Sequence, residues 1–134
     1  MRKYLLDTHT LIWAIVDKSK LSNLVLKILQ DNDSNLFVSA VSFWEIAIKH
    51  GKGKMDLENF QIQNIPDYCR RLAIEQIPLM PEDTLNYSAL PFYENHKDPF
   101  DKMLICQCIC GNFTLISKDD KMKYYQGVGL ECIW

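Results

Sequence analysis

The sequence predicts an α/β fold, a three-layer α/β/α arrangement with a central parallel sheet. Short apolar runs of strand length alternate along the chain with longer segments of helical spacing. Such alternation is typical of a parallel sheet covered by helices on both faces. The chain has 134 residues, of which 48% are hydrophobic, enough for a compact core. We therefore expect residues 1–134 to form a single domain.

The N-terminal part is expected to contain two strands and two helices. Residues 3–6, KYLL, form a short apolar run typical of a buried strand. Helical spacing of apolar residues predicts one helix over 8–16 and another within 21–33. The polar stretch 32–35 ends the second helix. LFVSA, residues 36–40, is the next predicted strand.

The middle of the chain continues the alternation. Ser42 is the expected N-cap of a helix over 43–50, and Gly51 is the expected stop of that helix. IPDYCRRLAIE, residues 65–75, has the composition of a further helix. QIPLM, residues 76–80, is then predicted to be a strand.

The C-terminal part completes the pattern. Proline opens a predicted helix over 81–90, and Asp-Pro opens another over 99–110. FTLIS, residues 113–117, and LECIW, residues 130–134, are predicted strands. Between them, KDDKMKYY, residues 118–125, is expected to form a short polar turn or helix.

Overall composition restricts the function only weakly. Fifteen Lys and Arg against 17 Asp and Glu give a net charge of −2, which neither indicates nor excludes a nucleic-acid partner. No apolar stretch is long enough to cross a bilayer, and the first apolar run lacks the features of a signal peptide, so a cytoplasmic protein is expected. The 5 cysteines contain no C-x-x-C pair and are expected to be reduced thiols in the core.

Four acidic residues stand near the carboxyl ends of predicted strands. They are Asp7, Glu45, Asp101 and Asp119. In an open parallel sheet, ligands bind in the crevice at these strand ends. Each acid also has an ordinary structural explanation: Asp7 can cap a helix, Glu45 can complete a capping box with Ser42, and Asp119 can occupy a turn.

Taken together, the four acids favour a metal site. Several carboxylates in one crevice repel one another unless a cation compensates them, and oxygen ligands of this kind suit Mg²⁺ or Mn²⁺. Thr8 and Ser117 lie next to the acids and are candidates for holding them in place. Asp98 is the expected N-cap of the helix over 99–110 and a further candidate for such support.

These segments resemble the PIN-domain ribonucleases, and among them the VapC-type toxins of toxin–antitoxin pairs. The resemblance runs through YLLDTHTLIW, SFWEIAIKHGKGKMDL, HKDPFDKMLICQC and TLISKDD, in this order, over nearly the whole chain. It implies a PIN-like fold and a Mg²⁺- or Mn²⁺-dependent site that cleaves RNA phosphodiesters. The catalytic, metal-ligating acids would be Asp7, Glu45, Asp101 and Asp119. The chain departs from the family's pattern at Lys102, where relatives often have Arg, and at Ser117, where many have Thr.

The resemblance also implies a homodimer and a cognate antitoxin. Lysines near the acids can hold the flanking phosphates of RNA, and Lys49 is the expected substrate-binding residue. The three histidines match no catalytic position of the family; His96, next to a helix start, is expected to be a surface or capping residue. Trp13 is expected to pack in the core or at a dimer interface rather than to stack on bases.

Two other functions remain open at this point. A phospho-acceptor signalling domain also binds Mg²⁺ through acids at strand ends, but it would need adjacent acids after the first strand, where this chain has Asp7 followed by Thr8 and His9. A non-catalytic PIN-like interaction module would have no need to keep all four acids.

Overall fold

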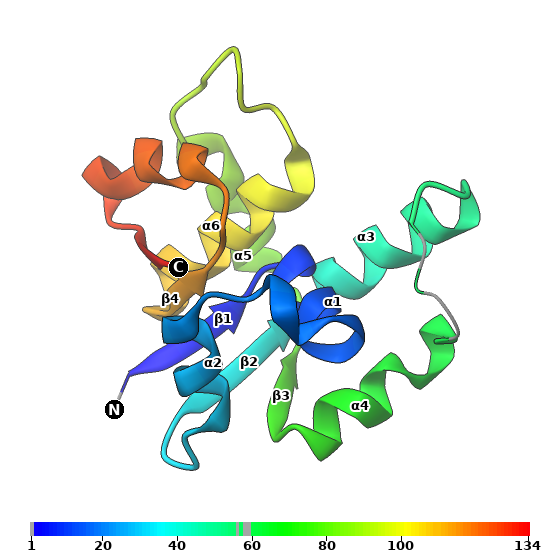
Figure 1. Ribbon diagram of the computed structural model, residues 1–134. Helices are drawn as coiled ribbons and strands as arrows, with labels where there is room; N and C mark the ends of the chain where they lie inside the picture. The colour runs from blue at the N-terminus through cyan, green and yellow to red at the C-terminus, as the bar shows by residue number, and fades with distance from the viewer. Residues whose placement is uncertain (1, 56, 58–59) are drawn as a thin grey trace.

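A single parallel sheet organises the molecule (Figure 1). The computed structural model describes residues 2–55, 57 and 60–134. The strands lie in the order β3-β2-β1-β4-β5, and every neighbouring pair is parallel. Their bounds are β1 (Lys3–Leu6), β2 (Asn35–Ser39), β3 (Ile74–Ile77), β4 (Thr114–Ile116) and β5 (Glu131–Ile133).

Helices connect the strands and cover both faces. The α-helices are α1 (Thr8–Val16), α2 (Asn23–Gln30), α3 (Ala40–Gly51), α4 (Ile65–Arg71), α5 (Pro81–Asn86) and α6 (Pro99–Gly111). Short 3₁₀ segments are η1 (Lys18–Lys20), η2 (Ile62–Asn64), η3 (Tyr87–Ala89) and η4 (Asp120–Val128). The expected α/β class and the parallel sheet are confirmed.

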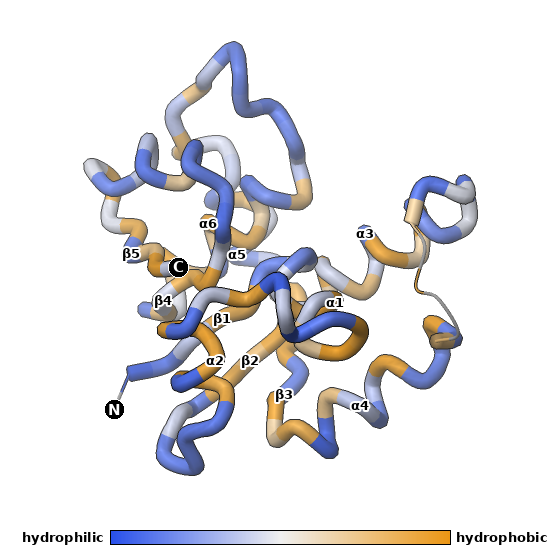
Figure 2. Tube along the Cα trace, in the orientation of Figure 1, coloured by the Kyte–Doolittle hydropathy of each residue, from blue (hydrophilic) through white to orange (hydrophobic). Residues whose placement is uncertain are grey.

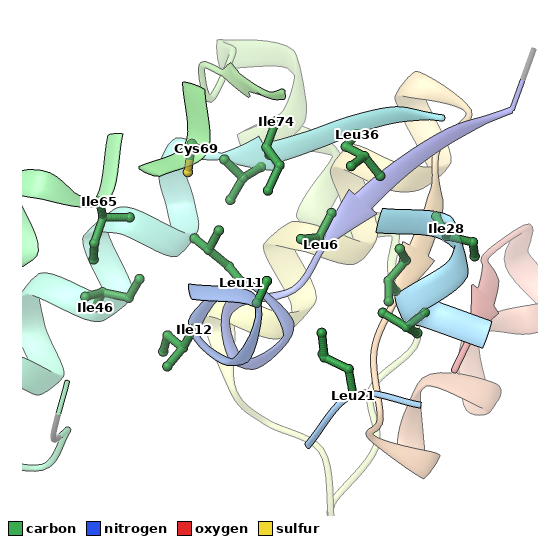
Figure 3. Close-up of a cluster of buried hydrophobic side chains, with 14 of the residues drawn as sticks. Leu6, Leu11, Ile12, Leu21, Ile28, Leu36, Ile46, Ile65, Cys69 and Ile74 are labelled. Atoms are coloured by element: carbon green, nitrogen blue, oxygen red, sulfur yellow. The ribbon is translucent and has the colours of Figure 1, made fainter. Parts of the chain in front are cut away.

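Two apolar clusters hold the three layers together. The first packs α1, α2 and α4 against one face of the sheet and includes Leu6 (Figure 3). The second packs α6 and η4 against the other face and includes Leu5. Leu5 and Leu6 are both fully buried, because successive side chains of a strand point to opposite faces. Figure 2 shows hydrophobic residues along β1 and β2 and a mainly hydrophilic stretch directly before α6.

The predicted boundaries around β3 are wrong. The helix expected over 65–75 ends at Arg71, and the strand expected over 76–80 spans Ile74–Ile77. Ala73 causes the shift, because it adopts a left-handed conformation with φ 55° and turns the chain directly into the strand. Ile74 is then buried at 2% exposure and pairs with Leu36.

The predicted start of α3 is also wrong. Ser39, not Ser42, is the N-cap, and its hydroxyl accepts a hydrogen bond of 3.0 Å from the backbone N–H of Val41. The helix therefore begins three residues earlier than expected. Ser42 is buried inside it, and Glu45 lies beyond the first turn. The capping box proposed for Ser42 and Glu45 does not form, which leaves the Glu45 carboxylate available for other contacts.

The remaining elements lie close to their predicted positions. Asp98 caps α6, as expected, and accepts hydrogen bonds from the backbone N–H groups of Phe100 at 2.8 Å and Asp101 at 3.4 Å. Among the residues that the structure describes, no helix is both long and apolar enough to span a bilayer.

The strained turn before β3 gives a prediction about stability. Ala73→Gly should raise the free energy of unfolding by up to about 1 kcal/mol. A non-glycine residue in the left-handed region costs roughly 1–2 kcal/mol, which exceeds the roughly 0.4–1 kcal/mol that glycine loses through the greater entropy of the unfolded chain. Denaturant unfolding of the two proteins measures the difference.

Ala47 supplies a matched control, because it is also exposed but lies inside α3. Ala47→Gly should lower the free energy of unfolding by about 0.8–1.0 kcal/mol, the cost of glycine in a helix interior. Equal destabilisation by both substitutions would contradict the strain assigned to Ala73.

Candidate active site

The four predicted acids line one cleft. This cleft has a volume of about 330 Å³, and its walls include the carboxylates of Asp7, Glu45, Asp101 and Asp119. They come from four separate parts of the chain: the residue after β1, helix α3, the first turn of α6 and the loop after β4. Since β1 and β4 are parallel neighbours, their carboxyl ends open on the same edge of the sheet.

Asp7 connects β1 to α1 and is 6% exposed. Its backbone N–H donates to the carbonyl of Ile116 at 3.1 Å, which extends the pairing of β1 and β4. Its Oδ1 caps α1 by accepting a hydrogen bond of 2.8 Å from the N–H of Thr10. Burial raises the pKa of Asp7, and hydrogen bonds with the side chains of Ser117 and Thr10 oppose that rise only in part.

Glu45 is held on both of its carboxylate oxygens. The hydroxyl of Thr8 donates to Oε1 at 2.5 Å and lies 3.0 Å from the hydroxyl of Ser42. Lys49, one helical turn later, forms an ion pair with Oε2. Partial burial works to lower the pKa of Lys49, but the hydrogen bond and charge of Glu45, with the charges of Asp98 and Asp101, raise it overall. Thr8 therefore contacts a carboxylate of the cleft.

Asp98 and Asp101 have different environments although both line the cleft. The Oδ1 atom of Asp98 is engaged by the N-terminus of α6. Among the described residues, no backbone N–H donates a hydrogen bond to the carboxylate of Asp101. Burial, and then the negative charges of Asp98, Asp7, Glu45 and Asp119, raise the pKa of Asp101 to about 8.

Asp119 begins η4 and lies beside Ser117. Its Oδ1 accepts a hydrogen bond of 3.0 Å from the N–H of Lys121. Its own N–H donates to the hydroxyl of Ser117 at 3.2 Å. Ser117 also acts to lower the pKa of Asp7, and its expected supporting role stays a prediction.

His96 is where the structure departs most from expectation. It is 4% exposed, so the prediction of a surface or capping residue is wrong. The chain folds the ring inward, since the backbone N–H of His96 donates to the carbonyl of Tyr93 at 3.1 Å and closes a tight turn. Its Nε2 lies 3.4 Å from Oδ2 of Asp101 and 3.9 Å from Oδ2 of Asp119. Burial lowers the pKa of His96, against the opposing charge of Asp119.

Three more side chains line the cleft beyond the predicted set. Trp13 packs against the first apolar cluster, as expected, but also forms part of the cleft wall. His9 lies with its ring centre 5.7 Å from that of Trp13, and Lys118 lies 5.8 Å above the indole. Position in the sequence could have suggested both residues, because His9 comes two residues after Asp7 and Lys118 directly precedes Asp119.

Other predicted residues lie elsewhere. Lys102 is buried with its ammonium 4.9 Å from the ring centre of Tyr87 and is not part of the cleft wall. All five cysteines are free thiols, but the expectation that they are core residues is wrong for Cys110, which is exposed.

The composition of the cleft fits a divalent cation of the Mg²⁺ or Mn²⁺ type. Carboxylate oxygens are the ligands that these ions prefer. Burial is the largest cause of the raised pKa of Asp101, and the negative charges of the neighbouring carboxylates add to it. A cation would offset these charges. Asp101, Asp119 and His96 place one donor atom each within 4.8 Å of one another.

Comparisons with known proteins agree with this architecture. The PIN domain family model matches residues 4–128. Among solved structures, the chain is similar to VapBC2 from Rickettsia felis bound to a DNA fragment from its promoter, with 18% identity, a TM-score of 0.62 and coverage of 97% of this chain and 96% of the other. VapBC-1 from nontypeable Haemophilus influenzae has 19% identity, a TM-score of 0.64 and coverage of 97% and 96%.

A third similar structure is DNA-bound VapBC from Salmonella typhimurium, with 15% identity, a TM-score of 0.65 and coverage of 99% of this chain and 98% of the other. At these identities the likeness is one of fold. The comparison with curated proteins gives no match. The family match extends from β1 into η4 and includes all four acids of the cleft. The chain therefore belongs to the PIN domain family.

Proposed function

We propose that this chain is an endoribonuclease that requires Mg²⁺ or Mn²⁺ and acts in the cytoplasm as the toxin of a toxin–antitoxin pair. The observation that carries the proposal is the convergence of Asp7, Glu45, Asp101 and Asp119 on one cleft, with the pKa of Asp101 raised to about 8 by burial and by the neighbouring charges. Membership of the PIN domain family and similarity to VapBC structures support it.

In this proposal the four acids hold the cation. A bound cation would offset the charge of the scissile phosphate and make water a better nucleophile at neutral pH. Thr8 keeps the Glu45 carboxylate in place through its hydrogen bond to Oε1. Ser117 supports Asp119 differently, because its hydroxyl accepts a hydrogen bond from the backbone N–H of Asp119.

Lys49 serves RNA binding in two ways. Its ion pair with Glu45 anchors the side chain beside the acids, while 31% of the side chain stays exposed. An ammonium in this position attracts the phosphate flanking the cleavage site and offsets its repulsion by the acids. Lys118, also on the cleft wall, can contact a second phosphate.

The position of Glu45 argues against a phospho-acceptor domain. Such a domain needs an acceptor aspartate with adjacent acids, whereas here a helix-borne glutamate is buried at 2% exposure and held toward the cleft by Thr8 and Lys49. A non-catalytic interaction module has no use for a carboxylate cluster whose repulsion destabilises the fold.

The partners follow from the same proposal. An antitoxin would cover the acidic cleft with a segment that carries a basic side chain, since a guanidinium or ammonium pairs well with clustered carboxylates. A second copy of this chain would complete a homodimer. The VapBC structures from Rickettsia felis and Salmonella typhimurium contain bound DNA, and in a complex of this chain we assign DNA binding to the antitoxin.

The two aspartates of α6 provide the sharpest test of activity. Asp101→Asn should reduce RNA cleavage by more than about 100-fold, because even the partners of metal ligands change activity by 10–100-fold. Asp98→Asn should retain most of the activity, because Asn caps a helix about as well as Asp. Cleavage of a labelled RNA with Mg²⁺ or Mn²⁺, and with excess EDTA, measures both effects.

Thermal melts of the two variants without metal provide the control for folding. Asp101→Asn should melt at the same temperature as the parent or higher, since one member of a repelling cluster is gone. Parental cleavage by Asp101→Asn, or full parental activity in EDTA, would contradict the assignment.

The raised pKa of Asp101 predicts how stability without metal depends on pH. Its pKa is about 8 in the folded protein against an ordinary value of 3.8 for an aspartate, so between these values the folded state binds more protons than the unfolded state. The free energy of unfolding should therefore fall as pH rises from about 4 to about 8. Urea unfolding in EDTA at pH 5 and pH 8 measures this.

Two controls isolate the carboxylate repulsion. Asp101→Asn should flatten the pH dependence, and millimolar Mn²⁺ should restore stability at pH 8, since an ion that binds only the folded state stabilises it. A parent protein whose stability is the same at both pH values and indifferent to Mn²⁺ would contradict a shared cation site.

The homodimer is tested by multi-angle light scattering of the purified chain at micromolar concentration. We expect about twice the 15.7 kDa of one chain. Trp44 is 59% exposed on α3 and packs edge-on against Phe100 with ring centres 5.2 Å apart, a surface typical of an interface. A monomeric mass would contradict the dimer and leave the nuclease assignment intact.

A further inference from the structure

We propose that His96 provides a nitrogen ligand, through Nε2, to a cation held between Asp101 and Asp119 on one side of the cleft. The inference rests on the proposed function, because it adds a ligand to the same metal site. It concerns a residue for which the sequence indicated no chemical role, and it makes the donor set one of mixed nitrogen and oxygen atoms.

The distances among the three donors fit one ion. Nε2 of His96 lies 3.4 Å from Oδ2 of Asp101 and 3.9 Å from Oδ2 of Asp119. Ligand atoms bound at about 2.0–2.2 Å from a common cation are separated by roughly 3–4 Å at tetrahedral or octahedral angles. The donor atoms of all three residues lie within 4.8 Å of one another, so small side-chain adjustments would bring them onto one ion.

The burial of Nε2 points to a ligand independently of the acids. His96 is 4% exposed, and Nε2 has no hydrogen-bond partner among the described residues. Buried polar atoms without a partner are rare in folded proteins because they lose water and gain nothing in return. A cation between Nε2 and the two carboxylates would satisfy this atom.

The other ring nitrogen of His96, Nδ1, is held by a hydrogen bond with a buried tyrosine. Nδ1 of His96 lies 2.7 Å from the hydroxyl of Tyr125, and Tyr125 is completely buried. When Nδ1 carries the proton and donates it to this hydroxyl, Nε2 presents its lone pair to the two carboxylates. Metal-ligating histidines commonly have their second nitrogen held in this manner, which sets the ring orientation and the tautomer.

A nitrogen ligand has a consequence for metal preference. Imidazole binds transition metals well, whereas Mg²⁺ prefers oxygen ligands alone. His96 should therefore favour Mn²⁺ over Mg²⁺ in this protein, beyond any preference set by the carboxylates.

Pulsed electron paramagnetic resonance of the full chain loaded with Mn²⁺ tests the proposal directly, because a coordinated imidazole nitrogen modulates the electron spin echo. We expect ¹⁴N modulation in the parent and its loss in His96→Gln. His9→Gln is the matched control: His9 lines the same cleft but is exposed, and this variant should keep the ¹⁴N modulation. Thermal melts without metal verify that both variants are folded.

Calorimetric titration with Mn²⁺ and with Mg²⁺ gives a second readout. His96→Gln should weaken Mn²⁺ binding by about 10-fold or more, because substitutions beside a metal typically lower its affinity by 10–100-fold. The same variant should weaken Mg²⁺ binding less. Parent protein that binds Mn²⁺ without ¹⁴N modulation would overturn the role of His96 while leaving the proposed function standing. Modulation lost in His9→Gln but kept in His96→Gln would also overturn it. A parent that binds neither ion would overturn the proposed function itself.

Discussion

Repulsion among carboxylates at one edge of a parallel sheet is the constraint around which this molecule is arranged. Because β1 and β4 run side by side in the same direction, Asp7 and Asp119 leave the sheet at the same edge, and α3 and α6 bring Glu45 and Asp101 to it. Burial and these charges raise the pKa of Asp101 to about 8. The hydrogen bond of Thr8 and the ion pair of Lys49 hold the Glu45 carboxylate in place despite this repulsion. A cation would provide the missing opposite charge.

Helix capping and metal binding are compatible at this site. Oδ1 of Asp7 caps α1, and Oδ1 of Asp119 accepts the backbone N–H at the start of η4, while Oδ2 of Asp119 faces His96. A carboxylate has two oxygens, so one can be fixed by the backbone while the other is presented to a ligand. The backbone bond also fixes the side chain at no cost to its charge. Ordinary capping positions therefore supply preorganised ligands at the carboxyl ends of the strands.

Local sequence patterns could predict the α/β class, the strands β1, β2, β4 and β5 and the acids of the cleft. Those features depend on apolar runs, on cap residues and on the geometry of a parallel sheet. The errors arose where a single conformation decides the outcome. The left-handed Ala73 moves β3 earlier, and Ser39 takes the capping role expected of Ser42. His96 could not be placed, because its burial depends on Tyr125, which is 29 residues away in the sequence.

We propose that the four carboxylates share a divalent cation. Anomalous X-ray diffraction from crystals of the protein grown with Mn²⁺ can test this, because the anomalous signal locates manganese without reference to activity. We expect an anomalous peak inside the cleft, within bonding distance of the carboxylates of Asp7, Glu45, Asp101 or Asp119. A cleft without a peak in crystals that hold manganese elsewhere, or a peak outside the reach of all four acids, would contradict it.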